Sequence, residues 1–170
     1  GVSIEKAIAA LFPDANENEI HALVGHYEKA YFSKKISRDD LFAGVYDMLN
    51  ALKQNGYQLA IATGKTREGL DEALHATGTV DLFSITRCAD ETQSKPHPKM
   101  LEEIMTHLDI SPERVLMVGD STHDLQMAIN AGIASVGVAS GSHDANQLLN
   151  YRPLHCLANP TELRVHFIDP

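Results

Sequence analysis

The sequence has no tryptophan and only two cysteines, Cys88 and Cys156, among its 170 residues. Two thiols cannot build the disulfide framework of a small secreted domain or a four-cysteine zinc site, so a reducing cytoplasm is the expected compartment. Basic residues are also scarce, with Lys+Arg 14 against Asp+Glu 23 and a net charge of −9. A chain this acidic lacks the clustered cations that nucleic acids and anionic membranes require of their partners.

Long apolar runs are missing as well. No stretch approaches the roughly 20 apolar residues of a membrane-spanning helix, and the first residues do not have the pattern of a signal peptide. Hydrophobic residues still make up 44% of the chain, which is ordinary for a folded domain. A length of 170 residues fits one globular domain, or a core with a small appendage. We therefore expect a cytoplasmic protein that binds neither nucleic acid nor membrane.

The first 40 residues have helical patterns only. Ser3 predicts the N-cap of a helix over residues 4–11, which Pro13 would end. A second helix is indicated by one apolar stripe that should be buried, namely Ile20, Leu23, Val24 and Tyr27. The polar stretch 33–40 is typical of a linker. We expect residues 1–40 to form a small helical unit and residues 41–170 to form a separate core.

From residue 41 onward, apolar runs alternate with amphipathic helical stretches. Strands are predicted at 58–63, 82–87, 115–119 and 133–138, and helices at 45–52, 67–77, 98–108 and 122–131, with a last helix after residue 160. Strands that alternate with single helices imply parallel right-handed crossovers. The expected fold class is therefore α/β, with a parallel sheet covered by helices on both faces.

Polar side chains follow three of the predicted strands. Thr63 and Gly64 follow the first strand, Lys95 lies in the loop after the second, and Asp120 and Asp124 follow the third. Open α/β sheets bind ligands at the carboxyl ends of their strands, so these groups should converge. A hydroxyl, backbone N–H groups and an ammonium can hold a phosphoryl group, while two carboxylates are hard ligands suited to Mg²⁺. The pattern predicts phosphoryl chemistry assisted by Mg²⁺.

The order of these residues resembles the haloacid dehalogenase-like (HAD) superfamily of phosphohydrolases. Ala60-Ile61-Ala62-Thr63 is similar to its second motif, Lys95-Pro96-His97-Pro98 to its third, and the segment from Gly119 to Asp124 to its fourth. Each motif alone is weak, but three in order form a specific match, nearest to phosphoglycolate-phosphatase-like members. The resemblance implies a three-layer Rossmann-like parallel sheet core over residues 41–170, and a small helical cap to which residues 1–40 belong.

The resemblance also implies an activity and a set of site residues. The protein would be a Mg²⁺-dependent phosphatase that hydrolyses a small phosphorylated metabolite through an aspartyl-phosphate. Thr63, Lys95 and Asp120 would be catalytic, and Thr63, Gly64 and Lys95 would bind the phosphoryl group. Asp120 and Asp124 would bind the metal. The sequence does not indicate which phosphate ester is the substrate.

Two departures from the family pattern affect this reading. Gly64 stands where the family commonly has Asn, so a side-chain contact is lost there. The family's first motif, Asp-x-Asp-Gly-Thr, supplies the nucleophile and the acid/base, and no Asp-x-Asp occurs in these 170 residues. The resemblance implies that this chain is inactive alone. We expect a missing segment or a second chain to fill the central strand position, or else the two halves of the sheet to pair directly.

Other function classes share some of these features. A signalling receiver domain also uses Asp, Thr, Lys and Mg²⁺, but its carboxylates precede Thr and Lys, whereas here they follow. A dinucleotide-binding site is excluded because no Gly-x-Gly-x-x-Gly follows the first strand. A non-catalytic HAD-fold binding or regulatory module stays open. Asp90 either lies at the mouth of the pocket or caps a loop. Surface or packing roles are expected for Lys65, His97 and His123. Both cysteines are expected to be buried, inert thiols.

Overall fold

The computed structural model describes residues 3–33 and 36–168. Its strands are β1 (Ala60–Thr63), β2 (Ile85–Cys88), β3 (Leu116–Gly119), β4 (Ala134–Val138) and β5 (His155–Leu157). Its α-helices are α1 (Ile4–Leu11), α2 (Glu17–Ser33), α3 (Val45–Gln54), α4 (Arg67–Thr77), α5 (Lys99–Leu108), α6 (Thr122–Asn130), α7 (Ala145–Leu149) and α8 (Leu163–Phe167). Short 3₁₀ turns lie at η1 (Arg38–Asp40), η2 (Val80–Leu82), η3 (Pro112–Arg114) and η4 (Pro160–Glu162).

The strands form two parallel sheets, one with the order β1-β2 and one with the order β3-β4-β5. In the first sheet Thr63 pairs in register with Cys88, and in the second Gly119 pairs with Gly137 and Gly137 with Cys156. A helix connects each strand to the next along the chain, as parallel pairing requires. The expected α/β class is therefore confirmed.

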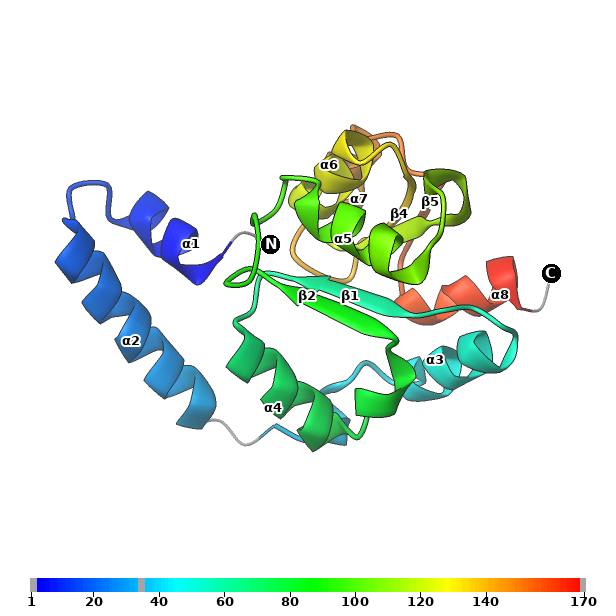
Figure 1. Cartoon of the computed structure of the whole chain (residues 1–170), viewed down its shortest axis with the longest axis horizontal. Helices are drawn as coiled ribbons and strands as arrows, with labels where there is room; N and C mark the ends of the chain where they lie inside the picture. Colours follow the sequence, from blue (N-terminus) through cyan, green and yellow to red (C-terminus); the bar gives the residue numbers. More distant parts are fainter. Residues whose placement is uncertain (1–2, 34–35, 169–170) are drawn as a thin grey trace.

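Two apolar clusters join these sheets into one layered body (Figure 1). Leu59 before β1 and Leu116 of β3 both pack against a cluster on one face, formed by Met48, Leu52, Val136, Leu157 and Leu163. Ala62 and Met117 pack against a second cluster on the other face, formed by Met100, Leu101, Met127, Ala128 and Ile133. Successive strand residues point to opposite faces, so β1 and β3 share the same two helical layers. Helices α3, α4 and α8 cover one face, and α5 and α6 cover the other.

The strands β1 and β3 do not pair with each other. Within residues 3–33 and 36–168, β1 pairs only with β2, and β3 pairs only with β4 and not with the first sheet. Direct pairing of the two halves, the last of the expected alternatives, is therefore not what the structure shows, and filling of the central position by another segment or chain stays a prediction. The physical reason is that the shared clusters fix both sheets against helices on each face.

Several element boundaries differ from the sequence predictions. β1 begins at Ala60 rather than 58, and β2 spans Ile85–Cys88 because residues 80–82 form a 3₁₀ turn instead of strand. The helix 67–77 is confirmed, with Gly78 in the left-handed conformation at φ +68 ending it. Neither α7 nor β5 was anticipated, since each is too short to show a period.

The N-terminal helices also depart in part from expectation. The Ser3 cap of α1 is confirmed, and Ile20 of α2 is buried, but Tyr27 is 48% exposed and does not belong to a buried stripe. The predicted linker 33–40 contains η1, while residues 34–35 lie outside the described part. The Arg38 guanidinium lies 4.1 Å from the centre of the Tyr46 ring, and its Nε donates to the Thr77 carbonyl.

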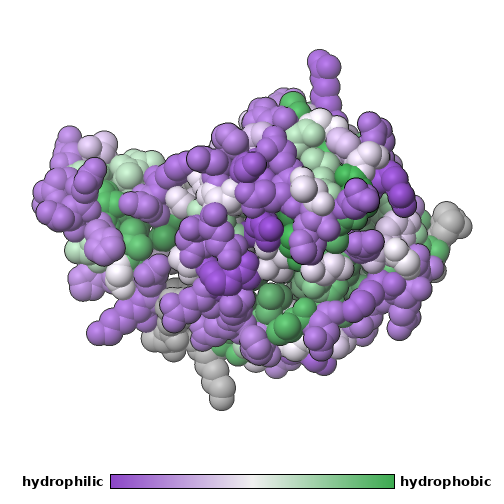
Figure 2. All heavy atoms as spheres, in the orientation of Figure 1, coloured by the Kyte–Doolittle hydropathy of each residue, from purple (hydrophilic) through white to green (hydrophobic). Residues whose placement is uncertain are grey.

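Helices α1 and α2 stand to one side of the sheets (Figure 1). One contact with the rest of the chain is the Lys6 ammonium, which donates to Ser94 Oγ at 2.6 Å. The division into residues 1–40 and 41–170 stays a prediction. The visible surface is mostly hydrophilic (Figure 2), in line with the net charge. No helix in the described ranges has the length and apolar character needed to cross a membrane.

The first prediction concerns the cluster that joins the two sheets. Replacing Leu157, which is 4% exposed, by Ala should lower the free energy of unfolding by roughly 2–5 kcal/mol, because it removes buried methyl groups and leaves a cavity. Leu154→Ala is the matched control, since Leu154 is 62% exposed and its loss should change stability by less than about 0.5 kcal/mol. Urea denaturation of both variants measures the difference, and equal effects would contradict the assigned packing.

Candidate active site

Three loops at the carboxyl ends of strands carry the candidate residues. Thr63 ends β1, and its Oγ1 accepts a hydrogen bond of 3.1 Å from the backbone N–H of Lys65. A hydroxyl that accepts from the backbone is oriented and still has its own O–H to donate. Thr63 can therefore donate to an anion placed beyond the end of β1.

Lys95, in the loop after β2, is buried at 7% exposure. Its ammonium lies 2.5 Å from Oδ1 of Asp124, with the two side chains 8% and 4% exposed. Oδ2 of Asp124 accepts from the backbone N–H of Ser121 at 3.1 Å and from its hydroxyl at 2.7 Å. The Ser121 hydroxyl in turn accepts from the Asp124 N–H, so the two residues form the capping box of α6. Asp124 is thus a helix cap and a counter-ion at once.

The charges of this pair are set by its surroundings. Burial by itself would raise the pKa of Asp124, but the Lys95 ammonium and the hydrogen bonds from Lys95 and Ser121 outweigh burial and lower that pKa. The carboxyl group is therefore ionised at neutral pH. Gly119 is required beside it, since a Cβ on Gly119 would lie 2.3 Å from Cβ of Asp124. The end of β3 and the start of α6 consequently pack in direct contact.

Asp120 is held by a loop that the sequence analysis did not single out. Oδ2 of Asp120 accepts from the N–H of Ser142 at 2.8 Å and from its hydroxyl at 3.0 Å, and the Asp120 carbonyl accepts from the N–H of His143. A Cβ on Gly141 would lie 2.0 Å from Oδ2, so a side chain there would displace the carboxylate. This loop follows β4, and the rule that ligands bind at strand carboxyl ends could have found it.

The structure brings Lys95 and Asp124 into direct contact and places Asp120 at the end of the neighbouring β3. Thr63 lies on the other sheet, and within the described residues no hydrogen bond joins it to these three side chains. Nor does the same part of the chain hold any group of three or more His, Cys, Asp or Glu placed to bind a metal. Asp120 and Asp124 are oxygen donors of the type that Mg²⁺ prefers, and they would form part of such a site.

The secondary candidates have structural roles in the main. Both carboxylate oxygens of Asp90 accept a hydrogen bond from the backbone N–H of Arg67. Asp90 thereby satisfies a backbone donor in the first turn of α4. His97 Nδ1 accepts from the Lys99 N–H at the start of α5. Burial, followed by nearby positive charges, lowers the pKa of the half-buried His123.

The two thiols differ. Cys88 is fully buried, and burial raises the pKa of its thiol to about 11, so it stays protonated at neutral pH. Cys156 is half-buried rather than buried as expected, because it lies on β5 at the outer edge of its sheet.

The second prediction concerns the buried ion pair. Asp124→Asn should lower the free energy of unfolding at pH 7 by about 3 kcal/mol, because it leaves the Lys95 charge buried without a counter-ion. The folded-state pKa of Asp124 is lowered, so its contribution is complete above the ordinary Asp pKa and is lost as pH falls through the lowered pKa. The difference between wild type and variant should therefore shrink below about pH 4. Denaturation across pH tests this, with the exposed Asp81→Asn as control.

Comparison with known proteins places this geometry in a family. A family model described as "Haloacid dehalogenase-like hydrolase" matches residues 1–138. The Dickeya dadantii (strain 3937) protein named "Probable phosphatase IndB" is 35% identical over 157 residues, covering 90% of this chain and 68% of the relative. The pyrophosphatase PpaX of Bacillus cereus (strain B4264) is 28% identical over 153 residues, covering 89% of this chain and 71% of the relative.

Solved structures agree with the sequence relatives. A structure from Bacteroides fragilis, described as that of a haloacid dehalogenase-like hydrolase, superposes with a TM-score of 0.85 at 26% identity and covers 95% of this chain and 77% of its own. A haloacid dehalogenase-like family hydrolase from Streptococcus pneumoniae has the same fold, with a TM-score of 0.82 at 23% identity over 98% of this chain and 77% of its own. Because the family model spans most of the sequence and the Dickeya relative shares 35% of the aligned residues, this chain belongs to the haloacid dehalogenase-like hydrolase family.

Proposed function

We propose that this chain is the larger part of a Mg²⁺-dependent phosphatase that hydrolyses a small phosphorylated metabolite through an aspartyl-phosphate. The observation that carries the proposal is the buried Lys95–Asp124 ion pair, at 2.5 Å, beside the carboxyl end of β3. A buried lysine with a fixed counter-ion supplies positive charge in a desolvated place, where charge acts most strongly on a phosphoryl group. The membership of the chain in a hydrolase family supports the same conclusion.

Binding of the phosphoryl group falls to Thr63, Gly64 and Lys95 in this proposal. The Thr63 hydroxyl and the N–H groups near Gly64 donate hydrogen bonds to phosphoryl oxygens, and Lys95 neutralises their charge. Gly64 contributes only its backbone, because it has no side chain. These groups orient the substrate and stabilise developing charge, but none of them is placed here as a nucleophile.

Metal binding falls to Asp120 and Asp124. Hydrogen bonds from Ser142 orient the Asp120 carboxylate, and those from Lys95 and Ser121 orient the Asp124 carboxylate. Both side chains are thereby fixed as oxygen donors that would hold the metal. Bound Mg²⁺ supplies neutralising charge for the phosphoryl oxygens.

The nucleophile requires a carboxylate from outside these 170 residues, because no Asp-x-Asp occurs among them. The open edges of β1 and β3 support a position for it, since both strands pack between the same two helical layers without pairing. A strand that enters between them would place an aspartate beside Thr63 and Asp120. We propose that a further segment of the protein, or a second chain, provides this strand.

The third prediction tests the activity. The 170 residues alone should hydrolyse an aryl phosphate at the background rate, and the chain preceded by a strand and helix with Asp-x-Asp-Gly-Thr should exceed it by at least about a hundredfold. Lys95→Ala in the extended protein should remove that gain, whereas Lys53→Ala, which changes an exposed lysine whose ammonium donates to the Asp81 carbonyl, should keep it. A panel that includes pyrophosphate ranks the substrates. Robust turnover by the 170 residues would contradict the proposal, and an inactive extended protein would favour the non-catalytic module.

The fourth prediction tests the metal site. Isothermal calorimetry should detect weak Mg²⁺ binding by the 170 residues, because the nucleophile's carboxylate is absent from the sequence. Asp120→Asn should abolish this binding, and Ser142→Ala should weaken it by about tenfold because Oδ2 loses its side-chain donor. The exposed Ser84→Ala should leave it unchanged. Binding that survives Asp120→Asn would place the metal elsewhere.

A further inference from the structure

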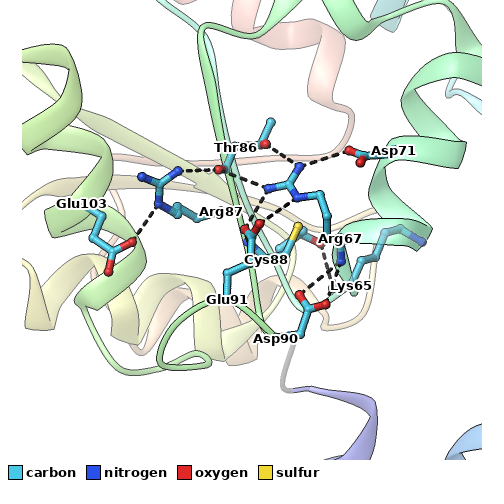
Figure 3. A network of polar contacts seen from close by, with 10 residues as sticks. Lys65, Arg67, Asp71, Thr86, Arg87, Cys88, Asp90, Glu91 and Glu103 are labelled. Carbon is cyan, nitrogen blue, oxygen red and sulfur yellow. Dashed lines mark hydrogen bonds and ion pairs between the residues drawn. The ribbon is translucent and has the colours of Figure 1, made fainter.

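A network of polar contacts lies beside the candidate site, between the start of α4 and the loop after β2 (Figure 3). At its centre, the Arg67 guanidinium makes a two-point ion pair with Glu91. Nε donates to Oε1 at 2.8 Å and Nη2 donates to Oε2 at 2.8 Å. Such a paired geometry fixes both side chains in one plane and one direction, which a lysine could not do.

The remaining donors of Arg67 are also engaged. Nη1 donates to Thr86 Oγ1 at 2.8 Å and to Asp71 Oδ1 at 3.1 Å, and Nη2 reaches the Thr86 carbonyl at 3.4 Å. The backbone N–H of Arg67 donates to both oxygens of Asp90. One residue thereby ties α4 to β2 and to the loop that follows β2.

That loop is tied in turn to the loop after β1. Oε2 of Glu91 accepts from the Cys88 N–H at 3.0 Å, and the Ala89 N–H donates to the Lys65 carbonyl at 3.1 Å. The Lys65 N–H donates to Thr63 Oγ1. Three hydrogen bonds, joined by the backbone of Cys88–Ala89 and of Lys65, therefore connect Glu91 to the Thr63 hydroxyl.

We propose that Arg67 and Glu91 are positioning residues that hold the loop from Thr63 to Lys65 in the conformation that binds the phosphoryl group. The inference rests on the proposed function, because it takes this loop as part of the phosphoryl site. Arg67 and Glu91 would not touch the substrate. They act through the backbone on each side of Lys65, so their loss should weaken phosphate binding more than it weakens the fold.

A second ion pair close by does not have this arrangement. Arg87 Nε and Glu103 Oε2 lie 2.7 Å apart, and their side chains are 28% and 30% exposed against 33% and 35% for Arg67 and Glu91. Glu103 accepts from Arg87 and Thr92 and from no backbone N–H among the contacts of the described chain. Hydrogen bonds from arginine lower the pKa of both Glu91 and Glu103. The two glutamates therefore share type, charge and exposure, but only Glu91 leads to the Thr63 loop.

The test compares Glu91→Gln with Glu103→Gln in the 170-residue chain. Inorganic phosphate with Mg²⁺ is the probe, and its affinity is measured by calorimetry for both variants, for Arg67→Lys and for Lys95→Met. Hydrogen exchange at the Lys65 amide is measured alongside. We expect Glu91→Gln and Arg67→Lys to weaken phosphate binding at least fivefold and to speed exchange at Lys65. Glu103→Gln should change neither, although it also removes the charge of a glutamate that pairs with an arginine.

The outcomes separate this inference from the proposed function. Loss of affinity in Lys95→Met with no change in Glu91→Gln overturns the positioning role and leaves the phosphoryl site standing. Binding unaffected by Lys95→Met overturns the phosphoryl site. If the wild-type chain binds no phosphate, hydrogen exchange at the Lys65 amide tests the positioning role by itself. Equal exchange rates in wild type and Glu91→Gln overturn that role. Equal effects of Glu91→Gln and Glu103→Gln on affinity also overturn it, since they indicate general loosening.

Discussion

The buried ion pair between Lys95 and Asp124 is the constraint on which the site depends. It joins the loop after β2, which belongs to one sheet, to the first turn of α6, which follows a strand of the other. A buried charge without a partner is strongly destabilising, so each residue fixes the position of the other. Ser121 adds the hydrogen bonds that the second carboxylate oxygen needs. The pair therefore holds the lysine charge in one place.

The two sheets are held relative to each other in a different way, by apolar packing. Parallel strands inside a sheet are normally paired on both sides, yet within the described residues β1 and β3 are each paired on one side, and their positions relative to each other depend on side chains. Leu59 and Leu116 contact the same cluster on one face, and Ala62 and Met117 contact the same cluster on the other. Burial of apolar surface is not directional, so it can set the spacing of two strands without any hydrogen bond between them.

Much of the fold could be predicted from the sequence, because the helices and strands of the core have clear periods and clear end signals. Helix α4 ends at Gly78 as expected, and the strand before Asp120 was placed to within one residue. The short elements α7 and β5 have no period, and Tyr27 fits the spacing of a helical stripe although it is 48% exposed. Sequence spacing reports which face of a helix is apolar, but not how much of that face another element covers.

The candidate site likewise contains residues that the sequence predicts and contacts that it does not. Thr63, Lys95, Asp120 and Asp124 could be chosen because each is a polar group that follows a predicted strand. The partner that holds Asp120 could not, because Ser142 meets it only through a tertiary contact. Asp124 had been assigned to the metal, and its ion pair with Lys95, 29 positions earlier in the chain, is visible only in three dimensions.

The hydrogen bond from Lys6 to Ser94 links α1 to the residue that precedes Lys95. Ser94 is itself buried, at 7% exposure, so water has little access to its hydroxyl when the Lys6 ammonium is absent. Loss of the lysine would leave a buried hydroxyl without this partner, which carries a cost in stability. Helix α1 thereby contributes to the setting of a loop that lies 88 positions further along the chain.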